Sequence, residues 1–195
     1  RGLGDVYKRQ GSELDVRNSL LKIMSLKSKR IIITSFASNV ARMESVFYCA
    51  NKIGRYVSLV GRSMNRIFKA ARQCGYLNNI EDPIDPRDAK KIPREKMVYI
   101  CTGSQGEPMG AMKRIIKDVH PDVFIEKGDT VIFSSKIIPG NEKKLYSLHN
   151  DIVRKEVELI TEETDFVHVS GHPNREDLKD MYCLLYTSPS PRDRY

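Results

Sequence analysis

The chain has 195 residues, of which 33 are Lys or Arg and 25 are Asp or Glu, so its formal net charge is +8. No apolar run is long enough to span a membrane and no signal peptide is visible, which argues against an integral membrane protein. The few cysteines have no CxxC spacing, which argues against a disulfide framework and a cysteine zinc site and favours a reducing cytoplasm.

The two ends of the chain differ from the sequence between them. A DNA sequence that encodes residues 183–193 can be chosen so that its reverse complement, read in another frame, encodes residues 1–9. We therefore expect residues 1–10 and 183–195 to be non-native and adaptor-derived, and residues 11–182 to be an internal piece of a longer protein. Without the five basic and two acidic residues of these ends, 28 basic and 23 acidic residues leave a net charge of +5. A net charge of this size is compatible with a polyanionic partner, and it is equally compatible with an ordinary soluble protein surface.

Helical and strand patterns alternate along residues 11–182. Apolar residues at helical spacing predict a helix over 14–26, and the β-branched run 30–36 predicts a strand buried on both faces. The further expected elements are helix 37–53 with Ser38 or Asn39 as N-cap, strand 56–60, helix 64–74, a loop over 78–95, strand 97–101, helix 109–117, strand 129–133, helix 142–155, and short apolar runs at 157–160 and 166–169. The alternation predicts one α/β domain with a mostly parallel sheet and helices on both faces.

The turns after the expected strands are rich in glycine and hydroxyl groups. In residues 102–108, TGSQGEP, the turn precedes a helical pattern, and we expect its backbone N–H groups and a Pro-started helix to face an anion. Similar turns are Thr34-Ser35-Phe36-Ala37-Ser38, Gly61-Arg62-Ser63, Ser134-Ser135 and Ser170-Gly171-His172. Ligands of open α/β sheets bind outside the carboxyl ends of the strands, so these turns are expected to share one edge that suits phosphate oxygens. The alternative, that α/β turns favour Gly and Ser for geometry alone, stays open.

Two of the four histidines are candidates for chemistry. A short strand at 166–169 is expected to place His168 and Ser170 on one face, and the following glycine to expose His172. An imidazole there can donate to a phosphate, act as a general acid or bind a metal, and a loop histidine without such a role is the open alternative. His120 and His149 are interpreted as structural. No complete metal-ligand set, G-x-S-x-G or P-loop is present, so the residues alone indicate a phosphate-facing domain without a complete catalytic set.

Five stretches resemble the ribonuclease J family, which belongs to the metallo-β-lactamase superfamily and carries an inserted β-CASP domain. They are TSFASNVAR, VGRSM, CTGSQGEPMGAMKRI, VIFSSKIIPGNE and HVSGHPNRED, and the resemblance covers essentially all of residues 11–182 in the family's order. It implies a zinc-dependent ribonuclease with two metal ions, acting on RNA both endonucleolytically and from the 5′ to the 3′ end. Most zinc ligands of the family, including an HxHxDH motif, are expected to lie outside this stretch, so no metal ligand is assigned within it.

The resemblance also assigns segments and site residues. Residues 11–165 correspond to the β-CASP domain, and residues 166–182 to a return segment toward the metallo-β-lactamase domain. The family segment that grips substrate phosphate corresponds to His168, Val169, Ser170, Gly171 and His172, with His172 as the catalytic residue.

A second substrate-contacting turn of the family resembles Phe36, Ala37 and Ser38. The resemblance implies a cytoplasmic parent without a membrane partner, whose assembly as a homo-oligomer is left open. The isolated piece is expected to be inactive. The alternative function is a non-catalytic module that binds RNA or nucleotide phosphates.

Overall fold

The computed structural model describes residues 11–187 of the chain. Its helices are α2 (Glu13–Ser25), α3 (Val40–Lys52), α4 (Arg62–Gln73), α5 (Pro86–Ala89), the 3-10 turn η1 (Arg94–Lys96), α6 (Ala111–Ile116), α7 (Glu142–Arg154) and α8 (Arg175–Thr187). Its strands are β1 (Ile31–Thr34), β2 (Tyr56–Val60), β3 (Met97–Cys101), β4 (Thr130–Phe133) and β5 (Glu158–Ile160). These elements confirm the predicted α/β fold.

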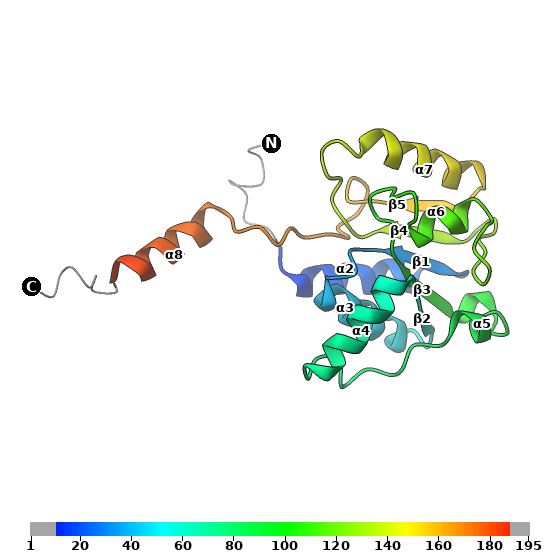
Figure 1. Ribbon diagram of the computed structural model, residues 1–195, viewed down its shortest axis with the longest axis horizontal. Coiled ribbons are helices and arrows are strands. Elements are labelled where there is room, and N and C mark those ends of the chain that lie inside the picture. The colour runs from blue at the N-terminus through cyan, green and yellow to red at the C-terminus, as the bar shows by residue number, and fades with distance from the viewer. Residues whose placement is uncertain (1–10, 188–195) are drawn as a thin grey trace, which may run out of the picture.

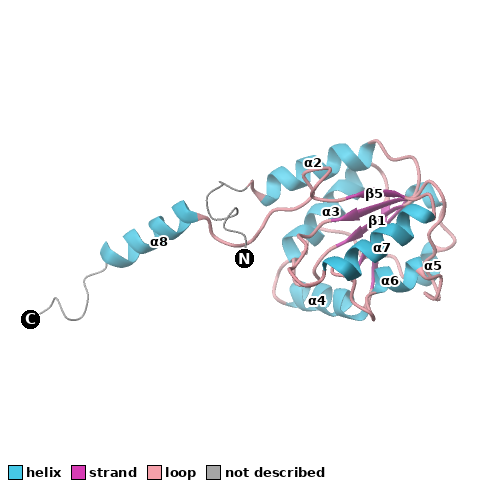
Figure 2. Cartoon of the chain, turned by 90° about the horizontal axis from the view of Figure 1, so that it is seen from above, coloured by secondary structure: helices cyan, strands magenta, loops and turns pink. Residues whose placement is uncertain are grey.

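The strands form one five-stranded parallel sheet in the order β2-β3-β1-β4-β5. Helices lie on both faces of the sheet, with α6 and α7 on one side and α2, α3 and α4 on the other (Figures 1 and 2). Because all strands run the same way, the segments that follow them emerge at one edge of the sheet. This edge is where ligands of open parallel sheets bind.

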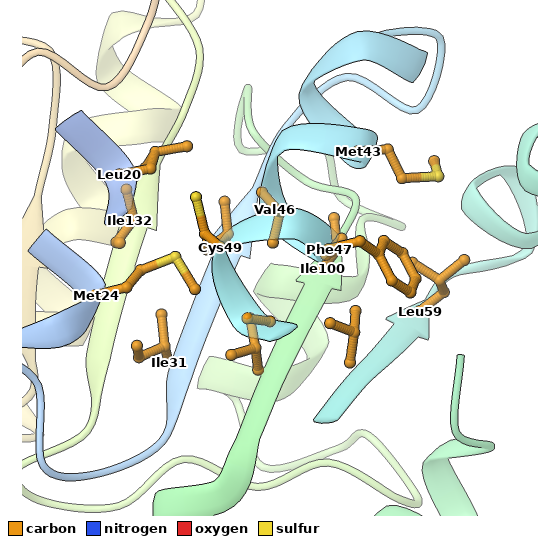
Figure 3. Close-up of a cluster of buried hydrophobic side chains, with 14 of the residues drawn as sticks. Leu20, Met24, Ile31, Met43, Val46, Phe47, Cys49, Leu59, Ile100 and Ile132 are labelled. Carbon is orange, nitrogen blue, oxygen red and sulfur yellow. The ribbon is translucent and has the colours of Figure 1, made fainter. Parts of the chain in front are cut away.

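Two apolar clusters, one on each face of the sheet, hold the helices in place. The first joins α2, α3 and α4 to the sheet, and its centre contains Met24, Ile31, Val46 and Ile100 (Figure 3). The second packs α6 and α7 against the opposite side chains of the same strands, among them Phe133. β1, β3 and β4 are buried along their whole length, which explains why their sequences are continuous apolar runs.

Most predicted elements are confirmed, with differences at their ends. Asn39 is the N-cap of α3, and its side chain accepts a hydrogen bond from Arg42 N at 3.0 Å. Helix α4 begins at Arg62, earlier than predicted, because Gly61 is its N-cap. The predicted loop 78–95 contains α5 and the start of η1, so it is partly helical.

One predicted strand is wrong. Residues 166–169 are not a strand, although they are as apolar as the strands of the sheet. The carbonyl of Val167 accepts hydrogen bonds from Arg42 Nη1 and Ser134 Oγ instead of joining a strand ladder. The segment is therefore held by side chains, at the edge where the strands end.

The return segment leads into α8, which extends away from the α/β body in both views (Figures 1 and 2). The predictions that residues 1–10 and 183–195 are non-native fall largely outside the described residues, since the structure describes neither 1–10 nor 188–195. Residues 183–187 belong to α8. The boundaries expected at 165 and 182 stay predictions. Within residues 11–187, no helix combines the length and hydropathy needed to cross a membrane.

Candidate functional site

The ends of three neighbouring strands are joined by backbone hydrogen bonds. Ser35 N donates to the carbonyl of Cys101 at 3.3 Å, and Ser134 N donates to the carbonyl of Thr34 at 2.9 Å. We call the segments 34–38, 134–135 and 167–172 the rim. The side-chain hydroxyl of Thr34 within it is fully buried and has no hydrogen-bond partner among the described residues.

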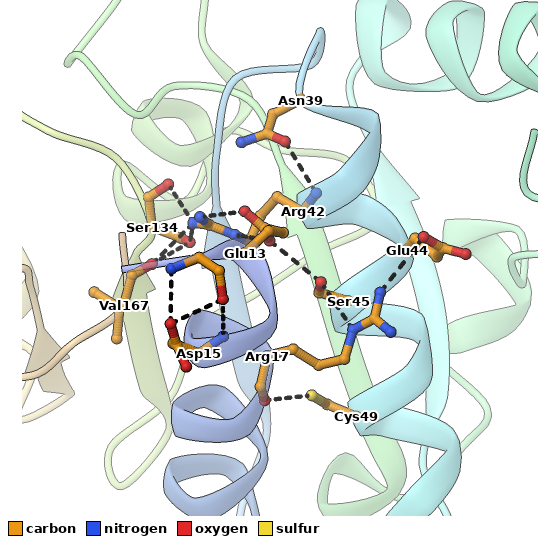
Figure 4. A network of polar contacts seen from close by, with 11 residues as sticks. Glu13, Asp15, Arg17, Asn39, Arg42, Glu44, Ser45, Cys49, Ser134 and Val167 are labelled. Carbon is orange, nitrogen blue, oxygen red and sulfur yellow. Dashed lines mark hydrogen bonds and ion pairs between the residues drawn. The ribbon is translucent and has the colours of Figure 1, made fainter. Parts of the chain in front are cut away.

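A buried arginine in α3 ties the rim together (Figure 4). The Arg42 guanidinium is fully buried, and Nε and Nη2 donate to the two carboxylate oxygens of Glu13 at 2.7 and 2.9 Å. Nη1 donates to Ser134 Oγ and, at 2.9 Å, to the carbonyl of Val167. One side chain thus connects the start of α2, the start of α3, the end of β4 and the segment that carries His168.

Burying this charge is costly, which makes its partners informative. Removing a guanidinium from water costs several kcal/mol, and the cost is offset only when a counter-charge and hydrogen bonds are in place. Glu13 supplies the counter-charge, and Ser134 and Val167 supply acceptors. The network therefore requires residue 167 to stay at the rim, and it positions the histidine that follows.

His168 is half-buried beside this network. The pKa of His168 is lowered to about 4, mainly by burial and also by the nearby Arg42 and Lys136 cations, while Glu13 and a hydrogen bond to the Ser134 backbone act in the opposite direction. The imidazole is therefore neutral at neutral pH. Its Nδ1 atom is buried and has no hydrogen-bond partner among the described residues.

His172 lies in the exposed turn that follows. Its backbone N–H donates to Ser170 Oγ at 3.2 Å, and both Gly171 and the His172 side chain are exposed. Gly171 has open space around its Cα, so the turn is reachable from solvent. The sequence-based prediction that the glycine exposes His172 is confirmed.

The turn before α3 lies at the same rim. Phe36 and Ala37 are half-buried and Ser38 is exposed, and Asn39 N donates to the carbonyl of Phe36 at 3.0 Å. Ala37 packs against the same apolar cluster as Val169. The structure therefore brings the two predicted substrate-contacting segments, 36–38 and 168–172, to one edge of the sheet.

The prediction for residues 102–108 is wrong. Gln105 N donates to the Glu107 carboxylate at 2.9 Å, and Thr102 caps the start of α6 by accepting from Ala111 N and Met112 N. The helix begins at Ala111 rather than beside Pro108, and Gln105 is buried. Since the Gln105 amide is bonded to an internal carboxylate and the Gln105 side chain is buried, the turn is a packed structural element.

No three side chains of His, Cys, Asp or Glu in residues 11–187 converge as a metal site. Two histidines of the rim do not make up the donor set that zinc requires for hydrolysis. The thiols of Cys49 and Cys101 are buried, and burial raises the pKa of both, which disfavours a thiolate ligand or nucleophile.

Comparison with known proteins identifies the family. A family model described as "Ribonuclease J, beta-CASP domain" matches residues 28–152. The chain belongs to the ribonuclease J family. It is 42% identical over 171 residues to Ribonuclease J of Sinorhizobium meliloti, with 88% of the chain and 30% of that protein covered.

Other ribonuclease J proteins also match most of this chain over about a third of their own length. The chain is 37% identical over 183 residues to Ribonuclease J of Mycolicibacterium smegmatis (93% of the chain, 32% of that protein). It is 38% identical over 175 residues to Ribonuclease J 1 of Streptococcus pyogenes (89% of the chain, 31% of that protein). The chain thus spans about a third of the length of these ribonuclease J proteins.

Arg42, which holds the rim together, was not among the site residues predicted from the sequence. A signal for it was present, because residues 42, 46 and 49 share one helical face, and Val46 and Cys49 are apolar. An arginine on the apolar face of a helix needs a buried counter-charge. The pattern does not say which carboxylate supplies it, since Glu13 lies 29 residues away.

Proposed function

We propose that this chain is the RNA-gripping β-CASP portion of a zinc-dependent ribonuclease that cleaves RNA internally and from the 5′ end. Membership of the ribonuclease J family supports ribonucleolytic activity in the parent protein. The observation that carries the proposal is the rim, where Arg42 holds the segment 167–172 beside the turn 36–38.

The rim residues suit a phosphodiester. His168 is neutral at neutral pH and half-buried at the rim, and the exposed turn at Gly171 allows a phosphate to approach the backbone closely. Contacts of this kind read the sugar-phosphate backbone and not the bases, as sequence-independent degradation requires. The proposal assigns His168, Val169, Ser170 and Gly171 to substrate binding.

His172 takes the catalytic role in this proposal. As an exposed imidazole next to the gripped phosphate, it is placed to give a proton to the leaving oxygen of the cleaved bond. The two zinc ions of the parent would be bound by residues outside 11–187, because the described residues do not converge on a metal site. For the same reason we expect the isolated chain to cleave no RNA, with or without added zinc.

The test is a His172→Ala substitution in the full-length parent protein. We expect the rate constant of single-turnover cleavage to fall about 10²- to 10⁴-fold, the range for loss of a general acid, while the Kd for RNA changes less than about threefold. Lys22→Ala on the exposed side of α2 is the control and should leave both values unchanged. A loss confined to binding would make His172 a phosphate anchor. Unchanged cleavage and binding would support the non-catalytic alternative for this segment.

A further inference from the structure

A basic cleft lies apart from the rim, between α4 and α6. It has a volume of about 970 Å³ and opens where β2 and β3 end, at Gly61 and Thr102. Four cationic side chains line it: Arg62, Arg66, Lys69 and Arg114. We call these four residues with their surroundings the basic cleft.

The four cationic side chains of the basic cleft have no polar partner in the part of the chain that the structure describes. Within residues 11–187, none of the four makes a side-chain hydrogen bond or an ion pair, and all four residues are exposed. The acidic residue of the lining, Asp122, is already paired with Lys90 at 3.0 Å. Like charges gathered in a concave surface repel one another, and a bound polyanion relieves this repulsion.

The neighbouring groups add donors to these charges. Gly61 is the N-cap of the 12-residue helix α4 and provides no side-chain cap, so the first-turn amides of α4 face the mouth of the cleft. His120 Nδ1 accepts hydrogen bonds from Asp122 N and Val123 N, which places the proton of the neutral imidazole on Nε2. The pKa of His120 is lowered by burial and by Arg114, so this neutral form prevails at neutral pH.

The spacing of the cations favours a chain of phosphates over a single one. Positions 62, 66 and 69 fall on one face of α4 and extend over about 10 Å along the helix axis. A row of this length can contact more than one phosphate of a nucleic-acid strand.

The cleft also lies within reach of the rim. β2 and β4 are separated by β3 and β1, so their ends are about 14 Å apart at ordinary strand spacing. A short single strand is therefore long enough to contact both the rim and the cleft.

We propose that the basic cleft binds the phosphate backbone of the single-stranded RNA whose scissile region lies at the rim. The assignment rests on the proposed function, which it deepens by adding a second contact region with Arg62, Arg66, Lys69 and Arg114 as phosphate ligands. In this proposal the cleft carries no catalytic group, and its four cations raise the affinity of the protein for RNA.

The experiment measures binding of a fluorescent single-stranded octanucleotide RNA to the full 195-residue chain over a range of salt concentrations. The variant R66A/K69A is compared with the control K22A/K143A, which removes the same charge from exposed positions outside the cleft. Two lost phosphate contacts should weaken binding about 10- to 30-fold at about 0.1 M salt and flatten the slope of log K against log salt by about 1.4. The control should change Kd less than about threefold. The charge-conserving variant R66K/K69R should bind like the unchanged chain, which separates loss of charge from loss of folding.

Three results would overturn the proposal: no binding by the unchanged chain, equal losses in the two neutralised variants, or no loss in R66A/K69A. Inorganic tripolyphosphate is added as a competitor of the labelled RNA. If it displaces the labelled RNA as effectively as unlabelled octanucleotide does, the cleft is a site for free polyphosphate and not for RNA. None of these results bears on His172, whose cleavage test in the parent protein decides the proposed function separately.

Discussion

At the scale of single residues, the rim is defined by a charge inside the protein and an uncharged histidine next to it. The positive charge of Arg42 is fully buried, and its neighbour His168 is held neutral by burial and by that charge. The same interaction that positions the segment thus also fixes the protonation state of the imidazole. Under the proposed function, substrate phosphate meets a neutral side chain there and not a second cation.

The pH dependence of stability tests this description of His168. Its folded pKa of about 4 lies below the ordinary value of 6.5, so the unfolded chain binds the proton first as the pH falls. The contribution of His168 to stability is therefore complete above about pH 6.5 and is lost as the pH falls from 6.5 toward 4. Since the side chain is partly exposed, we expect a loss on the order of 1–2 kcal/mol.

Urea unfolding of the chain between pH 4 and 7 measures this effect. A His168→Gln variant should show a shallower fall in the unfolding free energy. The part that remains should reflect His120 and His149, whose pKa values burial also lowers, and, near pH 4, carboxyl groups with lowered pKa such as Glu158. Parallel pH curves for the two proteins would show that His168 titrates normally.

At the scale of elements, the Arg42 network holds segments together that are far apart in the sequence. Glu13 in α2, Ser134 after β4 and Val167 before the return segment meet on one guanidinium (Figure 4). A lysine has the charge but cannot donate to both oxygens of a carboxylate in the same planar geometry while also reaching the other acceptors.

An Arg42→Lys substitution tests the network. We expect the free energy of unfolding to fall by about 2–4 kcal/mol, because buried acceptors lose their donors. Amide hydrogen exchange at Val167 and His168 should accelerate more than exchange in β1 and β3. The matched substitution Arg66→Lys, at an exposed position without a partner, should leave the stability unchanged within about 0.5 kcal/mol.

Much of the element order was predictable, and the errors have local causes. The strands β1 and β3 are continuous apolar runs buried on both faces, and Asn39 has the side chain that a helix N-cap requires. Residues 166–169 have the composition of a strand, but whether their carbonyls pair with a strand or with Arg42 depends on residues more than 100 positions away. The 102–108 turn has the composition of an anion site, but Glu107 occupies its amide.

At the scale of the molecule, the sheet edge carries both surfaces that we propose to bind RNA. The rim lies where β1 and β4 end, and the basic cleft lies where β2 and β3 end. The sequence pattern predicted the rim, since glycine and hydroxyl residues mark it. Of the basic cleft, the sequence pattern predicted the turn Gly61-Arg62-Ser63. It did not predict Arg66, Lys69 and Arg114, because only the fold brings these side chains of α4 and α6 together.

The central claim is that RNA phosphates are held along this edge of the sheet. The most direct test is a map of amide chemical shifts of the 195-residue chain during titration with a 5′-monophosphorylated octanucleotide RNA. We predict perturbations in segments 36–38 and 168–172 and along the first two turns of α4, while the exposed faces of α2 and α7 stay unchanged. Perturbations confined to α2 and α7, with none at the rim, would contradict the account.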